Sequence, residues 1–126
     1  MKIVYITNAR LPTEKAHGVQ IIKMIEALSS LNNEVVLISP NRIQNEISHK
    51  TSVFDFYNVE KNFEHNLINF IDPYKYRSLM PKFFYRFFSF LVNLLWGIKS
   101  AKIGSKLNGD FYIFRDNTPF SYLFCA

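Results

Sequence analysis

Two short stretches of this 126-residue sequence carry polar residues that are well placed for chemistry. One begins at Asn8 and ends at Gly18, after a mainly apolar run at residues 2–7. The other is the pair Arg115 and Asp116, after a mainly apolar run at residues 110–114. Ligands of open α/β sheets bind outside the carboxyl ends of parallel strands. If both runs are such strands, these residues meet at one edge of a sheet.

The residue types indicate a ligand that carries negative charge. A glycine at the start of a helix lets the backbone approach a phosphate closely, and the positive end of the helix points there. Arg115 can hold an anion through its planar fork, and Asp116 can orient Arg115 or accept a sugar hydroxyl. Two structural alternatives remain: Gly18 only permits a tight entry into the helix, or Arg115 and Asp116 form a surface ion pair of little energetic value.

The order of the predicted elements is typical of an α/β fold. A strand at residues 2–7, a loop at 8–18, a helix at 19–31 and a strand at 35–38 form a βαβ unit. We expect further strands at residues 63–71 and 110–114, a long helix at 82–106 and a helix that begins at Thr118 and Pro119. These elements predict a Rossmann-like open parallel sheet with helices on both faces.

Residues 52–59 allow two interpretations. Ser52 and Asp55 have the spacing of a capping box, which predicts a short helix at residues 53–57 that ends at Asn58. A strand over residues 52–59 is the alternative.

The predicted helix at residues 82–106 is apolar nearly all round. One stripe of bulky side chains recurs at steps of three and four residues: Phe83, Phe84, Phe87, Phe88, Leu91, Leu94, Leu95 and Ile98. We favour burial of this helix against the sheet and, in a full-length protein, against neighbouring helices, because eight bulky residues near one face suit a core. The alternative is an amphipathic helix on an anionic membrane, since lysines and arginines flank the stripe.

Composition limits the classes of function. A net charge of +5 suits an anionic partner, and a single cysteine, Cys125, excludes a disulfide framework or a cysteine metal cluster. The histidines at 49 and 65 have no partner at metal-ligand spacing. We see neither a secretory signal nor an apolar stretch long enough to span a membrane. We therefore expect a cytoplasmic location, with peripheral attachment to the inner face of the membrane as an option.

Two other classes of ligand fit less well. A dinucleotide site would need a G-x-G-x-x-G motif and an acidic residue after the second strand, whereas Gly18 stands alone and Ser39-Pro40-Asn41 follows that strand. We expect no nucleic acid partner, because the aromatic residues lie at helical spacing beside leucines, as in a core.

The chain resembles the N-terminal, acceptor-side domain of retaining glycosyltransferases of the GT-B type (the glycosyl transferase family 4-like group). The features that carry the resemblance are the strand at residues 2–7, the block from Glu14 to Gln20, the strand at 34–37, and the segments 54–59 and 110–116. The resemblance implies that Lys15 and His17 contact the acceptor or a phosphate. It implies a nucleotide-sugar donor, a glycan or lipid-linked acceptor, and no metal or other cofactor.

The resemblance also implies that a second Rossmann-like domain holds the donor and a Glu-x₇-Glu-like carboxylate pair. We expect residues 1–126 to be part of a larger protein, because the helix predicted after Pro119 has no C-terminal cap. Without the second domain we expect these residues to be inactive alone. The alternative is a non-enzymatic module that binds a membrane surface or another protein.

Overall fold

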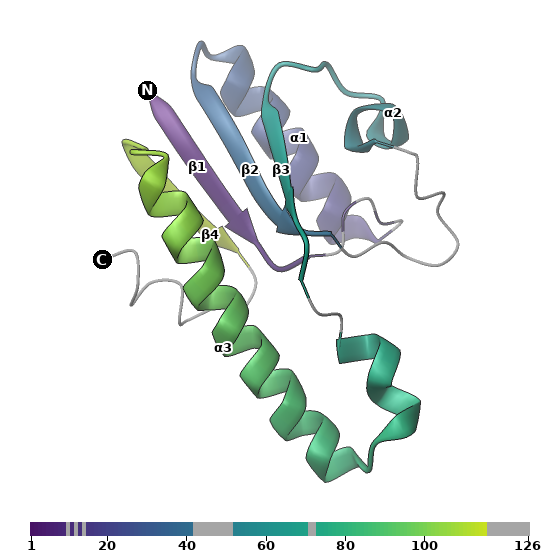
Figure 1. The fold of residues 1–126 in the computed structure, drawn as a ribbon. Helices are drawn as coiled ribbons and strands as arrows, with labels where there is room; N and C mark the ends of the chain where they lie inside the picture. Colours follow the sequence, from purple (N-terminus) through teal and green to yellow (C-terminus); the bar gives the residue numbers. More distant parts are fainter. Residues whose placement is uncertain (10, 12, 14, 42–51, 71–72, 116–126) are drawn as a thin grey trace.

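The protein is built on a four-stranded parallel sheet with the strand order β3-β2-β1-β4 (Figure 1). The strands are β1 (Lys2–Thr7), β2 (Glu34–Pro40), β3 (Glu64–Ile68) and β4 (Phe111–Arg115). This computed structural model describes residues 1–9, 11, 13, 15–41, 52–70 and 73–115. The fold is the α/β Rossmann-like arrangement that the sequence predicts.

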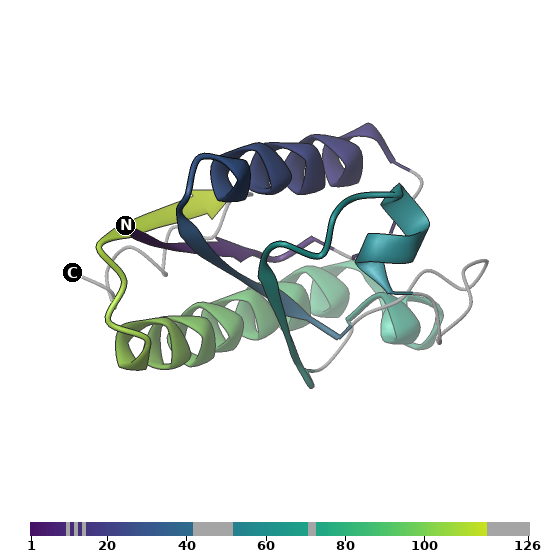
Figure 2. The same ribbon diagram turned by 90° about the horizontal axis from the view of Figure 1, so that it is seen from above.

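Helices cover both faces of the sheet. The helix α1 (Ala16–Ser30) lies on one face and α3 (Lys82–Lys106) on the other (Figure 2). The short helix α2 (Val53–Tyr57) packs on the same face as α1, whereas the 3₁₀ helix η1 (Pro73–Leu79) packs against α3. Parallel strands need this double cover, because their apolar side chains alternate between the two faces.

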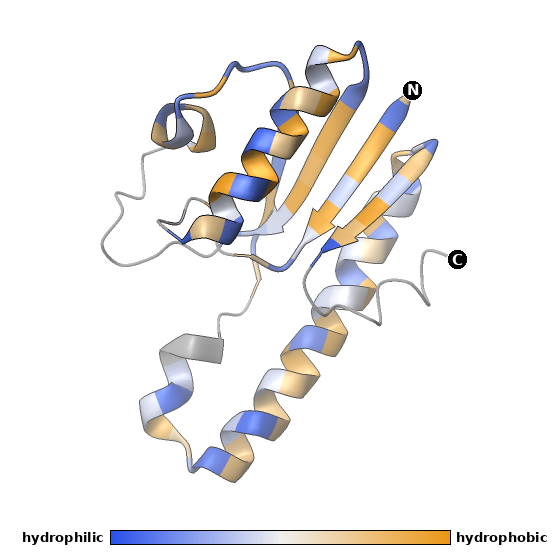
Figure 3. Cartoon of the chain, turned by 180° about the vertical axis from the view of Figure 1, so that it is seen from behind, coloured by the Kyte–Doolittle hydropathy of each residue, from blue (hydrophilic) through white to orange (hydrophobic). Residues whose placement is uncertain are grey.

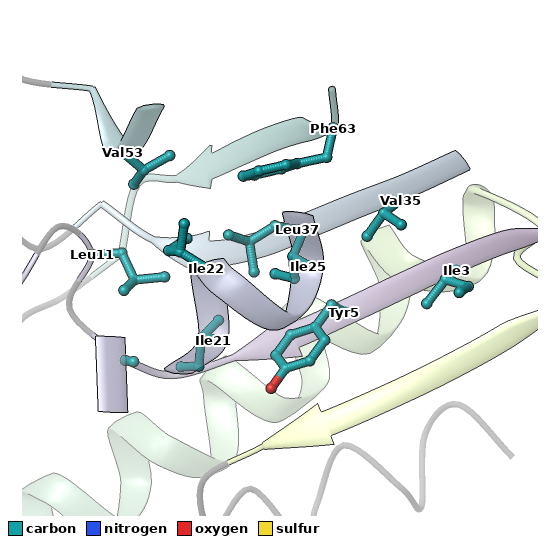
Figure 4. Packing of buried hydrophobic residues seen from close by; sticks show 11 residues of the cluster. Ile3, Tyr5, Leu11, Ile21, Ile22, Ile25, Val35, Leu37, Val53 and Phe63 are labelled. Carbon is teal, nitrogen blue, oxygen red and sulfur yellow. The ribbon is translucent and has the colours of Figure 1, made fainter. Parts of the chain in front are cut away.

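Two separate hydrophobic cores lie between the sheet and its helices, one on each face. On the α1 face, Tyr5 and Leu37 meet Ile21, Ile22 and Ile25 of α1 (Figure 4). On the α3 face the fully buried Trp96 packs with apolar residues of β1, β2 and β3, namely Val4, Ile6, Val36, Ile38 and Ile68. Figure 3 shows that the strands are largely apolar between the two helices.

The ends of the helices follow local sequence signals. Ser52 caps α2 by accepting a hydrogen bond from the backbone N–H of Asp55, so the helical interpretation of residues 52–59 is confirmed. Asn32, Asn58 and Asn108 adopt positive φ angles within two residues of the ends of α1, α2 and α3, a conformation that asparagine tolerates.

Some predicted boundaries were wrong by a few residues. The first helix begins at Ala16 rather than at residue 19, which shortens the preceding loop. The third strand spans Glu64–Ile68 rather than 63–71, and the fourth spans Phe111–Arg115 rather than 110–114. The second strand is longer than predicted, because its pairing with β1 and β3 extends it to Glu34 and Pro40. The helix predicted to begin at Thr118 lies outside the described residues.

Packing of the α3 stripe on the sheet was wrongly predicted for its N-terminal residues, whereas packing on neighbouring helices of a longer protein stays a prediction. The side of α3 that meets the sheet consists mainly of small residues around Trp96: Val92, Gly97, Ser100, Ala101 and Gly104. Phe83, Phe84 and Phe87 are instead 59–79% exposed. The reason is length, since a helix of 25 residues is about 37 Å long and strands of five to seven residues are only about 17–24 Å. The N-terminal half of α3 therefore extends beyond the sheet (Figure 1).

Close packing fixes the C-terminal end of α3 to β1. The backbone N–H of Gly109 donates to the Tyr112 hydroxyl, which donates to the carbonyl of Gly104 at 3.1 Å. A Cβ atom on Gly109 would lie 2.6 Å from the Cγ2 atom of Val4. Glycine at position 109 thus lets the chain turn from α3 into β4 directly over β1.

The Gly109→Ala variant is expected to lower the free energy of unfolding by about 1–3 kcal/mol, the usual cost of overpacking a close contact. Chemical denaturation followed by circular dichroism measures the change. Ser105→Ala, an exposed position in the last turn of α3, is the control and should change stability by no more than about 0.5 kcal/mol. Equal stability of the Gly109→Ala variant and the wild type would contradict this packing.

Candidate functional site

The strand order creates a topological switch point between β1 and β4. From β1 the chain moves through β2 to β3 on one side, and then crosses to β4 on the other side of β1. In open α/β sheets ligands bind at such a point, outside the carboxyl ends of the strands. The residues at that edge are the loop after β1, the first turns of α1 and the end of β4, where Thr7 pairs with Arg115.

The loop after β1 is anchored rather than loose. The Thr7 hydroxyl accepts a hydrogen bond from the backbone N–H of Ala9, and Leu11 is fully buried in the α1-side core. The Asn8 amide donates to the Asn93 side chain of α3 at 3.0 Å. Each contact holds the chain close to the sheet edge as it passes from β1 to α1.

Gly18 is buried in a contact between this loop and α2. The Tyr57 hydroxyl accepts from the backbone N–H of Thr13 at 2.8 Å and donates to the Thr13 carbonyl at 2.7 Å. A Cβ atom on Gly18 would lie 2.5 Å from both the Tyr57 hydroxyl oxygen and the Cγ2 atom of Thr13. The glycine therefore leaves room for Tyr57 to clamp the loop onto the first turn of α1.

Tyr57 was not singled out from the sequence. Burial raises the pKa of its phenol, and the hydrogen bond with the Thr13 backbone opposes this by a smaller amount. No local pattern predicts the contact, because 44 residues separate Tyr57 from Thr13.

The first turn of α1 is electrostatically positive. Lys15 occupies the N-cap position without a side-chain cap, and the turn contains no acidic residue. Lys15 is exposed and His17 is half-buried. The positive end of the helix dipole and the Lys15 ammonium thus act in the same direction, which favours an anion near this turn.

Arg115 adds a second cation on the same side of the sheet. Its Nη2 atom donates to the Gln20 side chain of α1 at 2.7 Å. Arg115 follows Ile113 by two residues, and Ile113 packs in the α1-side core, so both side chains leave β4 on the α1 face. Asp116, the predicted companion of Arg115, lies outside the described residues.

The structure separates one predicted site residue from the others. Lys15, His17 and Gly18 form the start of α1, and Arg115 contacts Gln20 of the same helix. The Asn8 side chain instead bonds to α3 on the opposite face. The sequence placed Asn8 at the correct edge but could not show to which face its side chain turns.

A second polar pair lies further along the sheet, on the α1 face. The Ser39 hydroxyl, fully buried at the end of β2, lies 2.7 Å from the Nε2 atom of His65 on β3. Burial lowers the pKa of His65 to about 4. Ser39 is closed to solvent, and the pair joins two neighbouring strands, whereas the His65 ring is only half-buried. The register between β2 and β3 brings the two residues together, and sequence reasoning missed the pair.

An open groove of about 660 Å³ lies at the other end of the strands. Its lining comes from the start of β2, from α2 and from the start of β3, and includes Glu34, Phe54, Lys61 and His65. It is therefore remote from the carboxyl edge where the predicted site residues gather. Within the described part of the chain, no group of three or more His, Cys, Asp or Glu residues is arranged to hold a metal ion.

Comparisons with protein-family models, with curated proteins and with solved structures found no match to this chain. The residues at the switch point and their geometry are therefore the basis for assigning a function.

A double-mutant cycle tests the clamp at Gly18. Gly18→Ala should lower the free energy of unfolding by about 1–3 kcal/mol through the new contact, and Tyr57→Phe by about 1–2 kcal/mol through lost hydrogen bonds. In the double variant the alanine no longer meets the hydroxyl, so the total loss should be smaller than the sum of the two single losses. Denaturant unfolding measures all three variants, and strictly additive losses would contradict the clamp.

The buried histidine predicts a pH dependence of stability. Since the folded-state pKa of His65 is about 4 and the ordinary value is 6.5, the unfolded chain binds the proton more readily between these pH values. Stability should fall as the pH drops through this window, by up to about 3 kcal/mol from this group. Denaturant unfolding at pH 7.5 and pH 4.5 should show a smaller loss for His65→Gln than for the wild type. His17→Gln is the matched control, and an unchanged loss in His65→Gln would contradict the prediction.

Proposed function

We propose that this chain is the acceptor-side part of a glycosyltransferase that moves a sugar from a nucleotide-sugar donor to a glycan or lipid-linked acceptor. The observation that carries the proposal is the switch point between β1 and β4, where Lys15, the first turn of α1 and Arg115 lie on one side of the sheet. The resemblance of the sequence to GT-B type transferases adds the reaction class.

The chemistry of the proposed reaction matches these residues. Transfer from a nucleotide sugar develops negative charge on the departing diphosphate, and cations and helix N-termini stabilise such charge. Arg115 donates to Gln20, which is uncharged, so binding a phosphate in its place would break a neutral hydrogen bond and no salt bridge with Gln20. Lys15 supplies a second charge, and His17 faces the acceptor in this proposal. Gly18 and Tyr57 contribute indirectly by holding the loop in place.

The residues at the end of β2 argue against a dinucleotide site, the main competitor of a sugar-nucleotide site in this kind of fold. A ribose-binding site there would need an acidic side chain. Ser39 is instead buried against His65, and the amide of Asn41 donates to the side chain of Asn69. The polar groups of these two residues are thus used within the fold.

On this proposal the donor domain and the catalytic carboxylates belong to a second Rossmann-like domain. The 126-residue chain should therefore bind phosphate-bearing ligands without catalysing transfer. The alternative, a non-enzymatic module that binds a membrane surface, is favoured by one observation, the exposed aromatic residues of α3.

Isothermal titration of the chain with a nucleotide sugar, a sugar 1-phosphate and a short polyprenyl phosphate tests the proposal. At least one should bind, and Arg115→Ala should weaken its binding by about ten- to a hundredfold, because a charge-assisted pair is worth about 1.5–3 kcal/mol. His17→Ala should weaken binding of the acceptor analogue more than that of the nucleotide sugar.

Lys61→Ala removes an exposed cation at the opposite end of the strands and is the control for charge. NAD is the control ligand. Tighter binding of NAD than of every sugar or prenyl phosphate, or equal affinity of the wild type and Arg115→Ala, would contradict the proposed site.

A further inference from the structure

The part of α3 that extends beyond the sheet exposes a large apolar surface. We call it the outer aromatic face; its members are Leu79 at the end of η1 and, on α3, Phe83, Phe84, Phe87, Leu91 and Leu95. Their exposed fractions range from 38% to 79%. Soluble domains rarely leave so many neighbouring large apolar side chains in water, and such patches mark interaction sites.

The α3 members of this face lie on one side of the helix. They recur at steps of three and four residues, which is the helical period. The side that meets the sheet, with Val92, Trp96 and Ser100, is displaced from it around the helix axis. The helix therefore carries one apolar surface for the core and a second that the described residues leave exposed.

η1 supports the extended half of α3 away from the sheet. The rings of Tyr76 and Phe88 meet edge to face, with centroids 5.8 Å apart. The backbone carbonyl of Pro81 accepts a hydrogen bond from the N–H of Tyr85 at the start of α3. Figure 1 shows η1 and the N-terminal half of α3 side by side below the sheet. The outer aromatic face is thus presented by an ordered pair of helices.

The charge of this region is strongly one-sided. Residues 73–109 contain seven lysines and arginines and no aspartate or glutamate. The other 89 residues contain eight basic and ten acidic residues, so the whole excess of positive charge comes from this region. Charges beside the face are also solvent-exposed, including Arg77, Lys82 and Arg86, with Lys102 and Lys106 further along α3.

These cations have no acidic partners in the described parts of the chain. The salt bridges found there join Lys2 to Glu34 and Lys23 to Glu26, both remote from η1 and α3. Lys99 donates to the backbone carbonyl of Asn69 and lies 5.6 Å from the centroid of the Phe70 ring, so its partners there are also not acidic. The region therefore combines exposed aromatic and aliphatic side chains with cations that have no acidic partner among the described residues.

We propose that the outer aromatic face docks on an anionic lipid bilayer, with α3 lying in the plane of the headgroups. Apolar side chains that enter the headgroup boundary, together with lysines and arginines attracted to anionic lipids, are the two components of binding by an interfacial helix. This inference rests on α3 and η1 and is independent of the proposed sugar-phosphate site.

Other binding partners would match either the apolar side chains or the positive charge of this region, but not all of both. A second copy of the chain would cover the apolar side chains, but it would bring two regions of charge +7 together without acidic residues between them. A nucleic acid would pair with the cations and could stack on the phenylalanines, but Leu79, Leu91 and Leu95, the other half of the face, offer bases no ring. An anionic bilayer accommodates both the leucines and the cations.

The helices in the described ranges are all too short or too polar to cross a membrane. The mode of contact in this proposal is accordingly attachment to one surface.

Flotation with lipid vesicles tests the proposal on the 126-residue chain. The chain should float with phosphatidylcholine vesicles that contain about one-third phosphatidylglycerol, and about 0.5 M salt should weaken binding because it screens the charges. Vesicles of phosphatidylcholine alone should retain much less protein.

Two sets of variants separate the apolar and the charged components. Phe83→Ser with Phe87→Ser should reduce partition into the anionic vesicles by more than about tenfold, since each phenylalanine loses its burial in lipid. Lys82→Glu with Arg86→Glu should reduce it by at least about tenfold, since each cation near an anionic surface contributes about fivefold. Leu31→Ser and Lys61→Glu are matched controls at exposed positions outside the region and should leave partition unchanged.

Circular dichroism checks that every variant is folded. If Phe83→Ser with Phe87→Ser does not fold, Lys82→Glu with Arg86→Glu still tests the proposal. Equal partition of the wild type and both variants would overturn the proposal. Tighter binding to an oligonucleotide than to anionic vesicles would also overturn it. Self-association that Phe83→Ser with Phe87→Ser abolishes, without vesicle binding by the wild type, would assign the face to a second copy.

Discussion

The structure depends on one constraint: the central strands β1 and β2 are buried on both faces of a parallel sheet and need apolar cover on each. α1 supplies it on one face with three isoleucines, and α3 supplies it on the other around Trp96. The two helices meet this demand differently. α1 is approximately as long as the strands it covers, whereas α3 is much longer and only its C-terminal half serves the core.

The same constraint explains where polar groups gather. Both faces and the centre of the sheet are occupied, so polar side chains that are open to a ligand lie beyond the strand ends. At the carboxyl edge, Tyr57 clamps the loop after β1, and Arg115 rests against Gln20. Lys15 at the uncapped start of α1 and Arg115 thus lie on one side of the sheet, while Ser39 and His65 are paired with each other.

Several elements were predictable because their signals are local. The capping residue Ser52, the asparagines that end the helices and the span of α3 depend on neighbours within a few residues. The start of α1 was less predictable, because Lys15 is not a good capping residue and Thr13 and Tyr57 position the first turn instead. Packing of the α3 stripe on the sheet was wrongly predicted for a related reason. A helix that is apolar nearly all round has no unique buried side until its neighbours are known.

The sequence by itself determined the fold class and the number of described strands with their order along the chain. It also placed Lys15, His17 and Arg115 near one edge of the sheet. Periodicity and caps specify elements, and the parallel βα order specifies which strand ends meet. Only the tertiary structure decided that Asn8 turns to α3 and Arg115 to α1, that Ser39 meets His65, and that the phenylalanines of α3 face outward. These outcomes depend on strand register and on the relative lengths of helix and sheet, which contacts between distant residues establish.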